Sequence, residues 1–173
     1  MTITDLKNSI PDFAKDVKLN FTSLIINSEY DDEVVYGAAY ASALALNDSQ
    51  ISKTFEDECR KRFGNDFIIS VKSTVVVMTL NNIWYKYRDA MSDPQMKMAP
   101  QKMRVNVMAN HAGLDKMLFE TLSLCISAIN GCPFCVRAHT DLLLTNGKTK
   151  EEIFNVGRIA SVITAMSKSI SLK

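Results

Sequence analysis

The sequence predicts an all-α protein that forms a single domain over residues 1–173. Apolar residues recur at spacings of three and four between short polar breaks, which is the helical period. No two β-rich runs are placed so that they could pair as strands. With 173 residues, 47% of them hydrophobic, the chain is long enough to bury a substantial core in one domain.

The first half of the chain predicts three helices. One runs from about Pro11 to Ser23 and has Phe13, Val17, Phe21 and Leu24 on one side. A second begins after Asp31, and its alanine and glycine content through Ala41 indicates close helix packing. The third covers Ser49–Phe63 and ends at Gly64, because glycine readily takes the left-handed conformation that ends many helices.

Residues 67–77 are the hardest to assign, because their β-branched side chains favour a strand. The segment continues without turn residues to Arg88, which is too long for one strand. We therefore predict a helix over 67–88. Its Trp84–Arg88 end could suggest stacking on nucleic acid, but near-neutral net charge favours aromatic packing on a helix face instead.

Asp89–Met103 is expected to be a loop, since it contains Pro94, Pro100 and several polar residues. Asp115 is expected to cap a helix that ends at Gly131. A further helix starts at the cysteine motif described below and ends at Asn146-Gly147. Thr149 and Glu152 have capping-box spacing for a last helix through Val162.

The most informative stretch is Cys132-Pro-Phe-Cys135, followed four residues later by His139. Pro133 suits the first position of a helix, which makes Cys132 the N-cap. Unpaired N–H groups in a first turn favour negative charge, so both sulfurs lie where the thiolate is stabilised. His139 is one turn beyond Cys135 on the same face, so imidazole and sulfur can meet. The pattern indicates a redox centre with a proton carrier.

A polar stripe lies on the preceding helix, where Glu120, Ser123, Ser127 and Gly131 recur at spacings of three and four. Periodicity leaves two interpretations open, a solvated edge or a polar extension of the cysteine site. Glu120 precedes Gly131 by about 16 Å of helix rise, so spacing alone does not bring its carboxylate to the sulfurs.

The composition of the chain bears on its binding partners and on its cellular compartment. Twenty basic and nineteen acidic residues give a formal charge of +1, so electrostatics offers no case for nucleic acid or an anionic membrane. The start of the chain lacks a basic region followed by an apolar run, and no later stretch is expected to span a bilayer. We expect a cytoplasmic protein. In a reducing compartment such as the cytoplasm, a CxxC motif is more often catalytic or metal-binding than structural.

The other candidate residues are assigned structural roles. Cys59 and Cys125 have no partner at motif spacing and are expected to pack in the core. His111 is expected in a loop or at a helix cap.

Several stretches together resemble one known family. They are residues 13–20, 81–85, 103–110 and 119–132, followed by the motif of a glutamate, eleven residues, CxxC, three residues and a histidine. On these the chain resembles the alkyl hydroperoxidase D family of the carboxymuconolactone decarboxylase-like superfamily. The resemblance covers nearly the whole chain and implies an all-helical bundle and a homotrimer.

By position, the family's functional residues fall on Glu120, Cys132, Cys135 and His139. The resemblance implies that Cys135 is the peroxidatic cysteine, Cys132 the resolving one, and Glu120 with His139 the proton relay. Some members have a second histidine just before the second cysteine, and here Phe134 takes that place. Any proton transfer by that histidine is therefore absent from this chain.

The implied activity is a thiol-dependent, antioxidant alkyl hydroperoxide reductase that also reduces a two-cysteine peroxiredoxin. No bound cofactor is expected. The electrons are expected from the dihydrolipoyl group of a dihydrolipoamide acyltransferase, which an NADH-dependent dehydrogenase recharges.

Two alternatives from other classes remain at this stage. Two cysteines, a histidine and a carboxylate could ligate zinc, although a second CxxC or histidine pair is missing. A non-peroxidatic interaction module or a decarboxylase-like enzyme could share the fold, although neither would require a CxxC.

Overall fold

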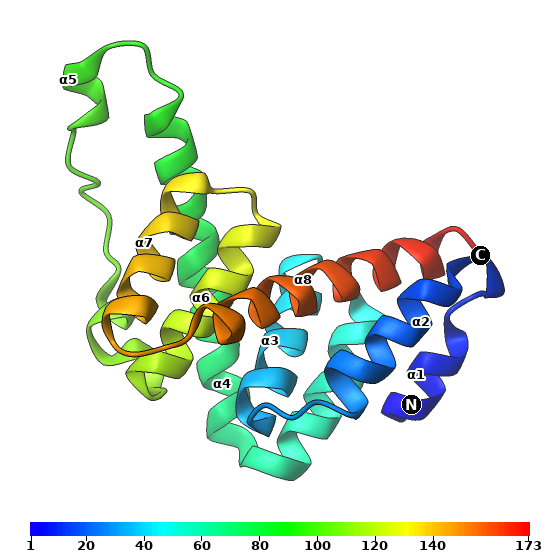
Figure 1. Ribbon diagram of the computed structural model, residues 1–173. Helices are drawn as coiled ribbons and strands as arrows, with labels where there is room; N and C mark the ends of the chain where they lie inside the picture. Colours follow the sequence, from blue (N-terminus) through cyan, green and yellow to red (C-terminus); the bar gives the residue numbers. More distant parts are fainter.

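A computed structural model describes all 173 residues as an all-α protein without β-strands, as the sequence predicted. The chain forms eight α-helices and three 3-10 or π segments (Figure 1). In order they are α1 (Ile3–Ser9), η1 (Asp12–Ala14), α2 (Lys15–Phe21), η2 (Thr22–Ile26), α3 (Asp32–Ala45), α4 (Ser49–Asp89), α5 (Pro94–Lys97), η3 (Asn106–Gly113), α6 (Lys116–Ile129), α7 (Pro133–Thr145) and α8 (Lys150–Ser171).

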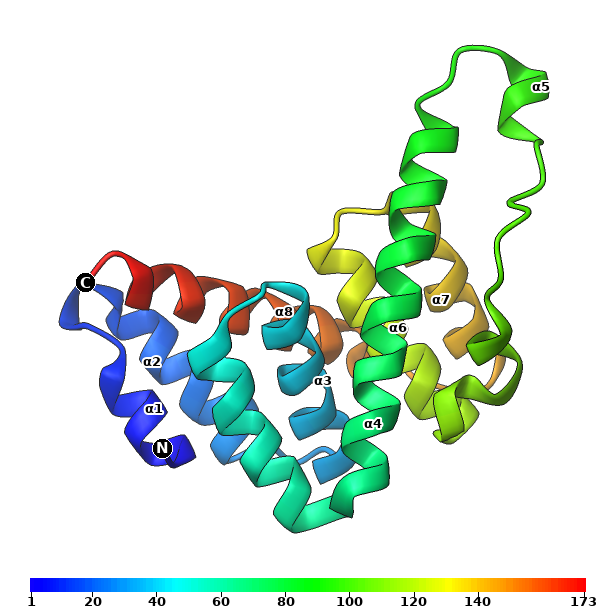
Figure 2. The same ribbon diagram turned by 180° about the vertical axis from the view of Figure 1, so that it is seen from behind.

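The core lies around α3, which packs against α4, α6 and α8. Every residue of α3 from Val35 to Ala43 is buried. Seen from behind, α4 is sharply bent, its second part runs up toward α5, and both chain termini lie at the opposite end of the molecule (Figure 2). The alanine-rich helix predicted after Asp31 is therefore confirmed as a closely packed central element.

The N-terminal region differs from the expected single helix over 11–23. It consists of α1, which the sequence analysis missed, and then η1, α2 and η2. The missed helix has a capping box, in which the Thr2 hydroxyl accepts a hydrogen bond from Asp5 N–H and the Asp5 carboxylate accepts one from Thr2 N–H. A T-x-x-D pattern ahead of apolar residues was the available signal.

The two predicted helices over 49–63 and 67–88 are both present and together form α4. Gly64, with φ +84°, breaks the helix where a left-handed residue was expected. The β-branched stretch is helical because Val71, Thr74 and Val75 are buried against the core. Tertiary burial therefore overrides the local strand preference of this segment.

An ion cluster joins the two parts of α4 across Gly64. The Glu56 carboxylate accepts hydrogen bonds from Tyr40 Oη at 3.0 Å and Arg60 at 2.6 Å, and it pairs with Lys72 Nζ at 3.0 Å. Burial pushes the pKa of Glu56 up, but the hydrogen bonds from Lys72, Tyr40 and Arg60 outweigh it and lower the pKa to about 2. The bend at Gly64 is thus held by charge-assisted contacts.

One correction concerns membrane spans. By length and composition α4 is apolar enough to cross a bilayer, contrary to the expectation that no stretch would be. However, 56% of its apolar window is buried inside the fold. The core helix of a folded domain has the same composition, so this finding is weak evidence for a span.

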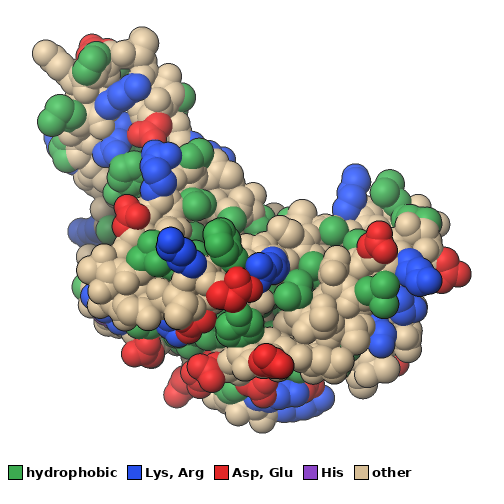
Figure 3. Space-filling view, in the orientation of Figure 1, with side chains coloured by type: hydrophobic (Ala, Val, Ile, Leu, Met, Phe, Trp, Pro, Cys, Tyr) green, Lys and Arg blue, Asp and Glu red, His purple; other side chains and the backbone are tan.

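Residues 90–105 form an arm that extends away from the helical body and contains α5 at its tip (Figure 1). The segment is mostly non-helical, as predicted, apart from the single turn that begins after Asp93. Lys and Arg side chains gather along this arm in the space-filling view (Figure 3). Gln101 Nε2 donates to Asn81 Oδ1 at 2.9 Å and ties the arm to α4.

The caps predicted in the second half are confirmed. The Asp115 carboxylate accepts hydrogen bonds from Met117 and Leu118 N–H at the start of α6. Thr149 and Glu152 form the predicted capping box of α8. The cysteine helix α7 ends at Thr145, next to the predicted Asn146-Gly147 stop. These local signals therefore position the helices that carry the site.

Gly37 on α3 lies close to side chains of two neighbouring helices. A Cβ at this position would lie 3.2 Å from Phe67 Cζ on α4 and 3.3 Å from Leu122 Cδ2 on α6. Contacts this short require the neighbouring side chains to shift. The glycine therefore sets the distance between α3 and the two helices beside it.

Gly37→Val is expected to lower the free energy of unfolding by about 1–3 kcal/mol, because it overpacks a full core. For a domain of this size that is a fall in Tm of roughly 2–4 °C per kcal/mol. Thermal unfolding followed by circular dichroism measures it. Gly157→Val is the matched control, since Gly157 is also helical and nothing lies within 4 Å of its added Cβ. Equal effects of the two substitutions would contradict the packing argument.

Candidate active site

The site is organised by the turn between α6 and α7. Cys132 N–H donates to Ser127 C=O at 3.0 Å, and Gly131 N–H donates to Ala128 C=O at 3.2 Å. These two bonds form a Schellman motif, which needs a left-handed residue after the helix. Gly131 supplies it with φ +64°. The connection is short enough that α7 returns antiparallel alongside α6.

Cys132 ends this motif and at the same time caps α7, as predicted. Its Sγ accepts a hydrogen bond from Cys135 N–H at 3.3 Å, and Pro133 is the first residue of the helix. The Cys132 and Cys135 sulfurs are joined in a disulfide, with 5.3 Å between the two Cα atoms. Both cysteines are buried, although Pro133 and Gly131 beside them are exposed. The pair therefore lies just beneath the surface, at a helix N-terminus that favours negative charge.

The antiparallel return of α7 brings Glu120 and His139 together. His139 Nδ1 lies 2.6 Å from Glu120 Oε2. Glu120 is seven residues before Ser127 (127 − 120), and His139 is seven residues after Cys132 (139 − 132), so the two helices stay in step. The second helix thus connects Glu120 to the cysteine helix through His139. Both side chains are buried.

The polar stripe on α6 faces the interior of the protein. Glu120 is 6% exposed and Ser123 and Ser127 are both 0% exposed. The solvated-edge interpretation is therefore wrong for these three residues, although Gly131 at the end of the stripe is exposed. Burying this many polar groups is costly unless they are hydrogen-bonded, which indicates a polar site rather than a surface.

Helix α4 fixes the turn from the other side. Asn82 Nδ2 donates to Ser127 Oγ at 2.9 Å, and Asn130 Nδ2 donates to Asn82 Oδ1 at 3.0 Å. Lys86 Nζ donates to Asn130 C=O at 2.8 Å. The sequence analysis assigned no role to Asn82 or Lys86. The only signal for them in the sequence is that they are polar residues within an apolar helix.

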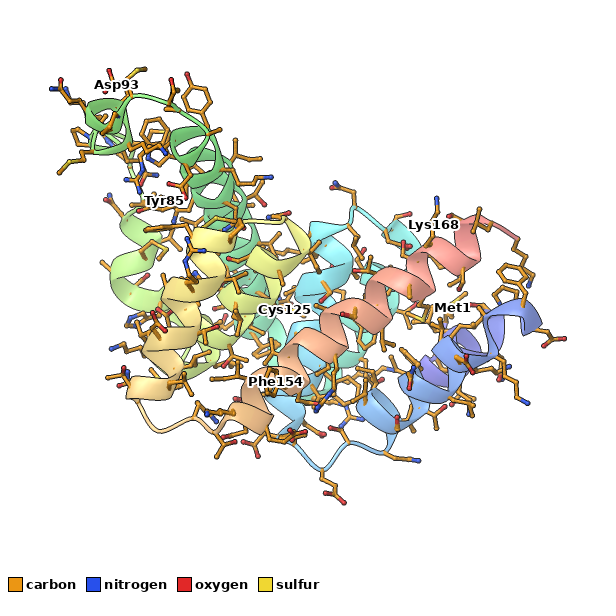
Figure 4. The ribbon with its side chains drawn as sticks, turned by 45° about the horizontal axis from the view of Figure 1, so that its top comes forward. Met1, Tyr85, Asp93, Cys125, Phe154 and Lys168 are labelled. Atoms are coloured by element: carbon orange, nitrogen blue, oxygen red, sulfur yellow. A yellow bond between two sulfur atoms is a disulfide. The ribbon has the colours of Figure 1, made fainter.

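Phe134 lies within the motif and stacks on an aromatic side chain of α4. The rings of Phe134 and Tyr85 are 4.6 Å apart and tilted by 22°. The Arg88 guanidinium lies 4.7 Å from the Tyr85 ring and 5.4 Å from the Phe134 ring. Figure 4 places Tyr85 where the arm leaves the body. The packing expected of the aromatic cluster is confirmed for Tyr85, whereas Tyr87 is exposed. The Tyr85–Phe134 stack also lies beside the Arg88 cation.

The remaining cysteines lie in the core, as the packing interpretation expected. Cys125 is at the centre of the molecule (Figure 4), and its Sγ lies 3.0 Å from Ser42 Oγ. Burial raises the pKa of Cys125 to about 11 and that of Cys59 to about 12. Because the thiolate is the reactive form of cysteine, these two thiols are poor nucleophiles.

One other candidate residue from the sequence, His111, lies outside the site. His111 is in η3 with φ +53° and packs near the ring of Phe119, 5.6 Å between centroids. This agrees with the expected loop or cap role.

No group of three or more His, Cys, Asp or Glu side chains is arranged to hold a metal ion, so the zinc alternative gains no support.

The fold and the site together define an all-helical protein that carries a disulfide-forming CxxC pair next to a buried carboxylate–histidine pair. The model of the Carboxymuconolactone decarboxylase family matches residues 94–171, a range that includes α6, α7 and α8.

Relatives of known name match almost the entire chain. One from Streptomyces griseus, named Alkyl hydroperoxide reductase AhpD, is 35% identical over 170 residues, which are 98% of this chain and 96% of the relative. Proteins of the same name from Brucella anthropi and Brucella canis are each 36% identical, covering 96% and 100% of this chain and 95% and 97% of their own lengths. The chain therefore belongs to the AhpD family of the carboxymuconolactone decarboxylase-like superfamily.

Proposed function

We propose that the protein is an antioxidant alkyl hydroperoxide reductase whose catalytic residues are Cys135, Cys132, His139 and Glu120. The observation that carries the proposal is the pairing of His139 with Glu120 one helical turn beyond Cys135, in a helix whose first turn holds both cysteines. The names of the relatives agree with this reaction.

In the first step, the reduced Cys135 thiolate attacks the distal peroxide oxygen. The O–O bond breaks, the sulfur gains oxygen as a sulfenic acid, and the alkoxide takes a proton to leave as an alcohol. The Glu120–His139 pair accepts the thiol proton as the thiolate forms and returns one to the leaving group. Because the pair is buried, its protons exchange with the site more readily than with bulk water.

In the second step, the Cys132 thiol condenses with the sulfenic acid. A disulfide forms and one water leaves. A dithiol donor then attacks the disulfide, forms a mixed disulfide and closes its own ring, which returns both cysteines to thiols. The cycle reduces one peroxide per dithiol oxidised.

The donor we propose is the dihydrolipoyl group of a dihydrolipoamide acyltransferase, recharged by an NADH-dependent dehydrogenase. By the same exchange chemistry the reduced cysteine pair passes electrons to a two-cysteine peroxiredoxin. The exposed Pro133 and Gly131 beside the disulfide support access by a protein-borne thiol. A cytoplasmic location fits this electron supply.

We also propose that three chains associate. Ile69, Val76 and Ile83 recur every seven residues on α4 and are 60%, 70% and 56% exposed. Large apolar side chains in a row on one helix face are typical of helix–helix contacts between subunits. This face supports assembly of a homotrimer, the form that the family resemblance implies.

The relay is tested by Glu120→Gln and His139→Ala. Each is expected to lower peroxide reduction by roughly 10²-fold, the usual contribution of a general acid–base group. Peroxide consumption at saturating donor measures the loss, and helical circular dichroism serves as the folding control. Near-normal turnover in either folded variant would remove that residue from the relay.

The donor is tested by comparing dihydrolipoamide with glutathione at equal thiol concentration. Dihydrolipoamide should sustain turnover far better, because its second thiol completes the exchange intramolecularly at high effective concentration. Cys135→Ser, tested with both donors, gives the background rate. Equal rates with the two donors would count against a lipoyl-dependent system.

A further inference from the structure

Ser123 has a buried hydroxyl without a hydrogen-bond partner. The residue is 0% exposed, and no donor or acceptor meets its Oγ. Serine and threonine inside helices usually bond back to a carbonyl one turn earlier, as Thr121 does on the same helix with Met117 C=O at 2.7 Å. An unpaired buried hydroxyl is unfavourable, so its place in the protein calls for an explanation.

Two contacts between α6 and α7 indicate which part of α7 lies at the level of Ser123. Glu120 meets His139, and Ser127 meets Cys132, so α6 and α7 run antiparallel in a constant register. Ser123 is three residues after Glu120, and Cys135 is four residues before His139. Ser123 and Cys135 therefore lie at the same height along the two helices, each about one helical turn from the Glu120–His139 pair.

The helical period also places both residues on the sides of α6 and α7 that face each other. Cys135 shares a face with His139, which points to α6, because they are four residues apart on α7. Ser123 shares the buried stripe with Glu120 and Ser127. The hydroxyl and the sulfur therefore come from facing sides of two adjacent helices.

We infer that Ser123 donates a hydrogen bond to the Cys135 sulfur when the pair is reduced, and so stabilises the attacking thiolate. This inference rests on the proposed function in taking Cys135 as the nucleophile. In the disulfide, Cys135 Sγ is held by Cys132 Sγ, carries no charge and makes no hydrogen bond with Ser123 Oγ. Reduction creates a thiolate, which accepts a charge-assisted hydrogen bond. The unpaired hydroxyl of the oxidised protein is thus explained by its partner in the reduced one.

The experiment measures the pH midpoint of Cys135 alkylation by iodoacetamide in reduced protein with a Cys132→Ser background, read by peptide mass spectrometry. Ser123→Ala is expected to raise this midpoint by roughly one to two pH units, since one hydrogen bond to the charged sulfur is lost. Ser123→Thr, which retains the hydroxyl, should keep most of the original midpoint.

The charged and titratable groups that contact α7 or the turn before it are Glu120 on α6, which pairs with His139 of α7, and Tyr85, Lys86 and Arg88 on α4. Ser123→Ala alters none of them. Thr121→Val is the matched control, because it removes a buried hydroxyl of the same helix that already has a partner in Met117 C=O. It is expected to lower thermal stability and leave the alkylation midpoint unchanged.

A second readout uses the intact cysteine pair. Without the hydrogen bond the dithiol form is less favoured, so the disulfide of Ser123→Ala should be roughly tenfold harder to reduce, about 30 mV more negative. An unchanged midpoint in Ser123→Ala, or an equal shift in Thr121→Val, would overturn the inference. Alkylation needs no peroxide, so a protein that fails to reduce peroxide would overturn the proposed function and leave this measurement to decide the hydrogen bond.

Discussion

The left-handed turn at Gly131 is the constraint on which the site depends. Its two backbone hydrogen bonds end α6 and place Cys132 where α7 begins. Any residue with a Cβ is strained at φ +64°. Because the turn is this short, the helices return side by side in one register, and that register sets Glu120 against His139. A longer or looser connection would separate the carboxylate from the helix that carries the thiols.

The four cysteines lie in two different environments. Cys132 and Cys135 lie in the first turn of a helix, where unpaired N–H groups stabilise an anion. Cys59 and Cys125 lie in the core, and burial raises the pKa of each thiol well above its usual value. This difference in position is the physical reason for proposing the first pair, and not the second, as the reactive thiols.

Much of the fold was predictable because its signals are local. Capping residues such as Asp115 and Thr149 fix helix starts through contacts within four residues. The chain's β-branched stretch in α4 was predicted as helix from its length, and its burial explains that outcome. The helix α1 was missed although its Thr2–Asp5 capping box is equally local. The broken helical path over 12–26 was missed because 3-10 and π turns leave no clear sequence period.

The site was predictable only in part. The CxxC motif and its position at a helix start follow from Pro133 and the N-cap rule, but the pairing of Glu120 with His139 depends on how two helices pack. The contribution of α4 through Asn82, Lys86 and Tyr85 is also tertiary, since these residues lie about fifty positions before the motif. Ser123 belongs to the polar stripe that the sequence analysis identified. Its proposed role, however, follows only from the structure, in which its hydroxyl is buried without a hydrogen-bond partner.

The central claim is that Cys135 attacks the peroxide and Cys132 resolves the product. Dimedone labelling after one equivalent of peroxide, read by mass spectrometry in Cys132→Ser and Cys135→Ser, tests it most directly. The account predicts a trapped sulfenic acid on Cys135 in the first variant, which has lost the resolving thiol, and none in the second. A label on Cys132 in the Cys135→Ser protein, with none on Cys135 in the other, would contradict the account and exchange the two roles.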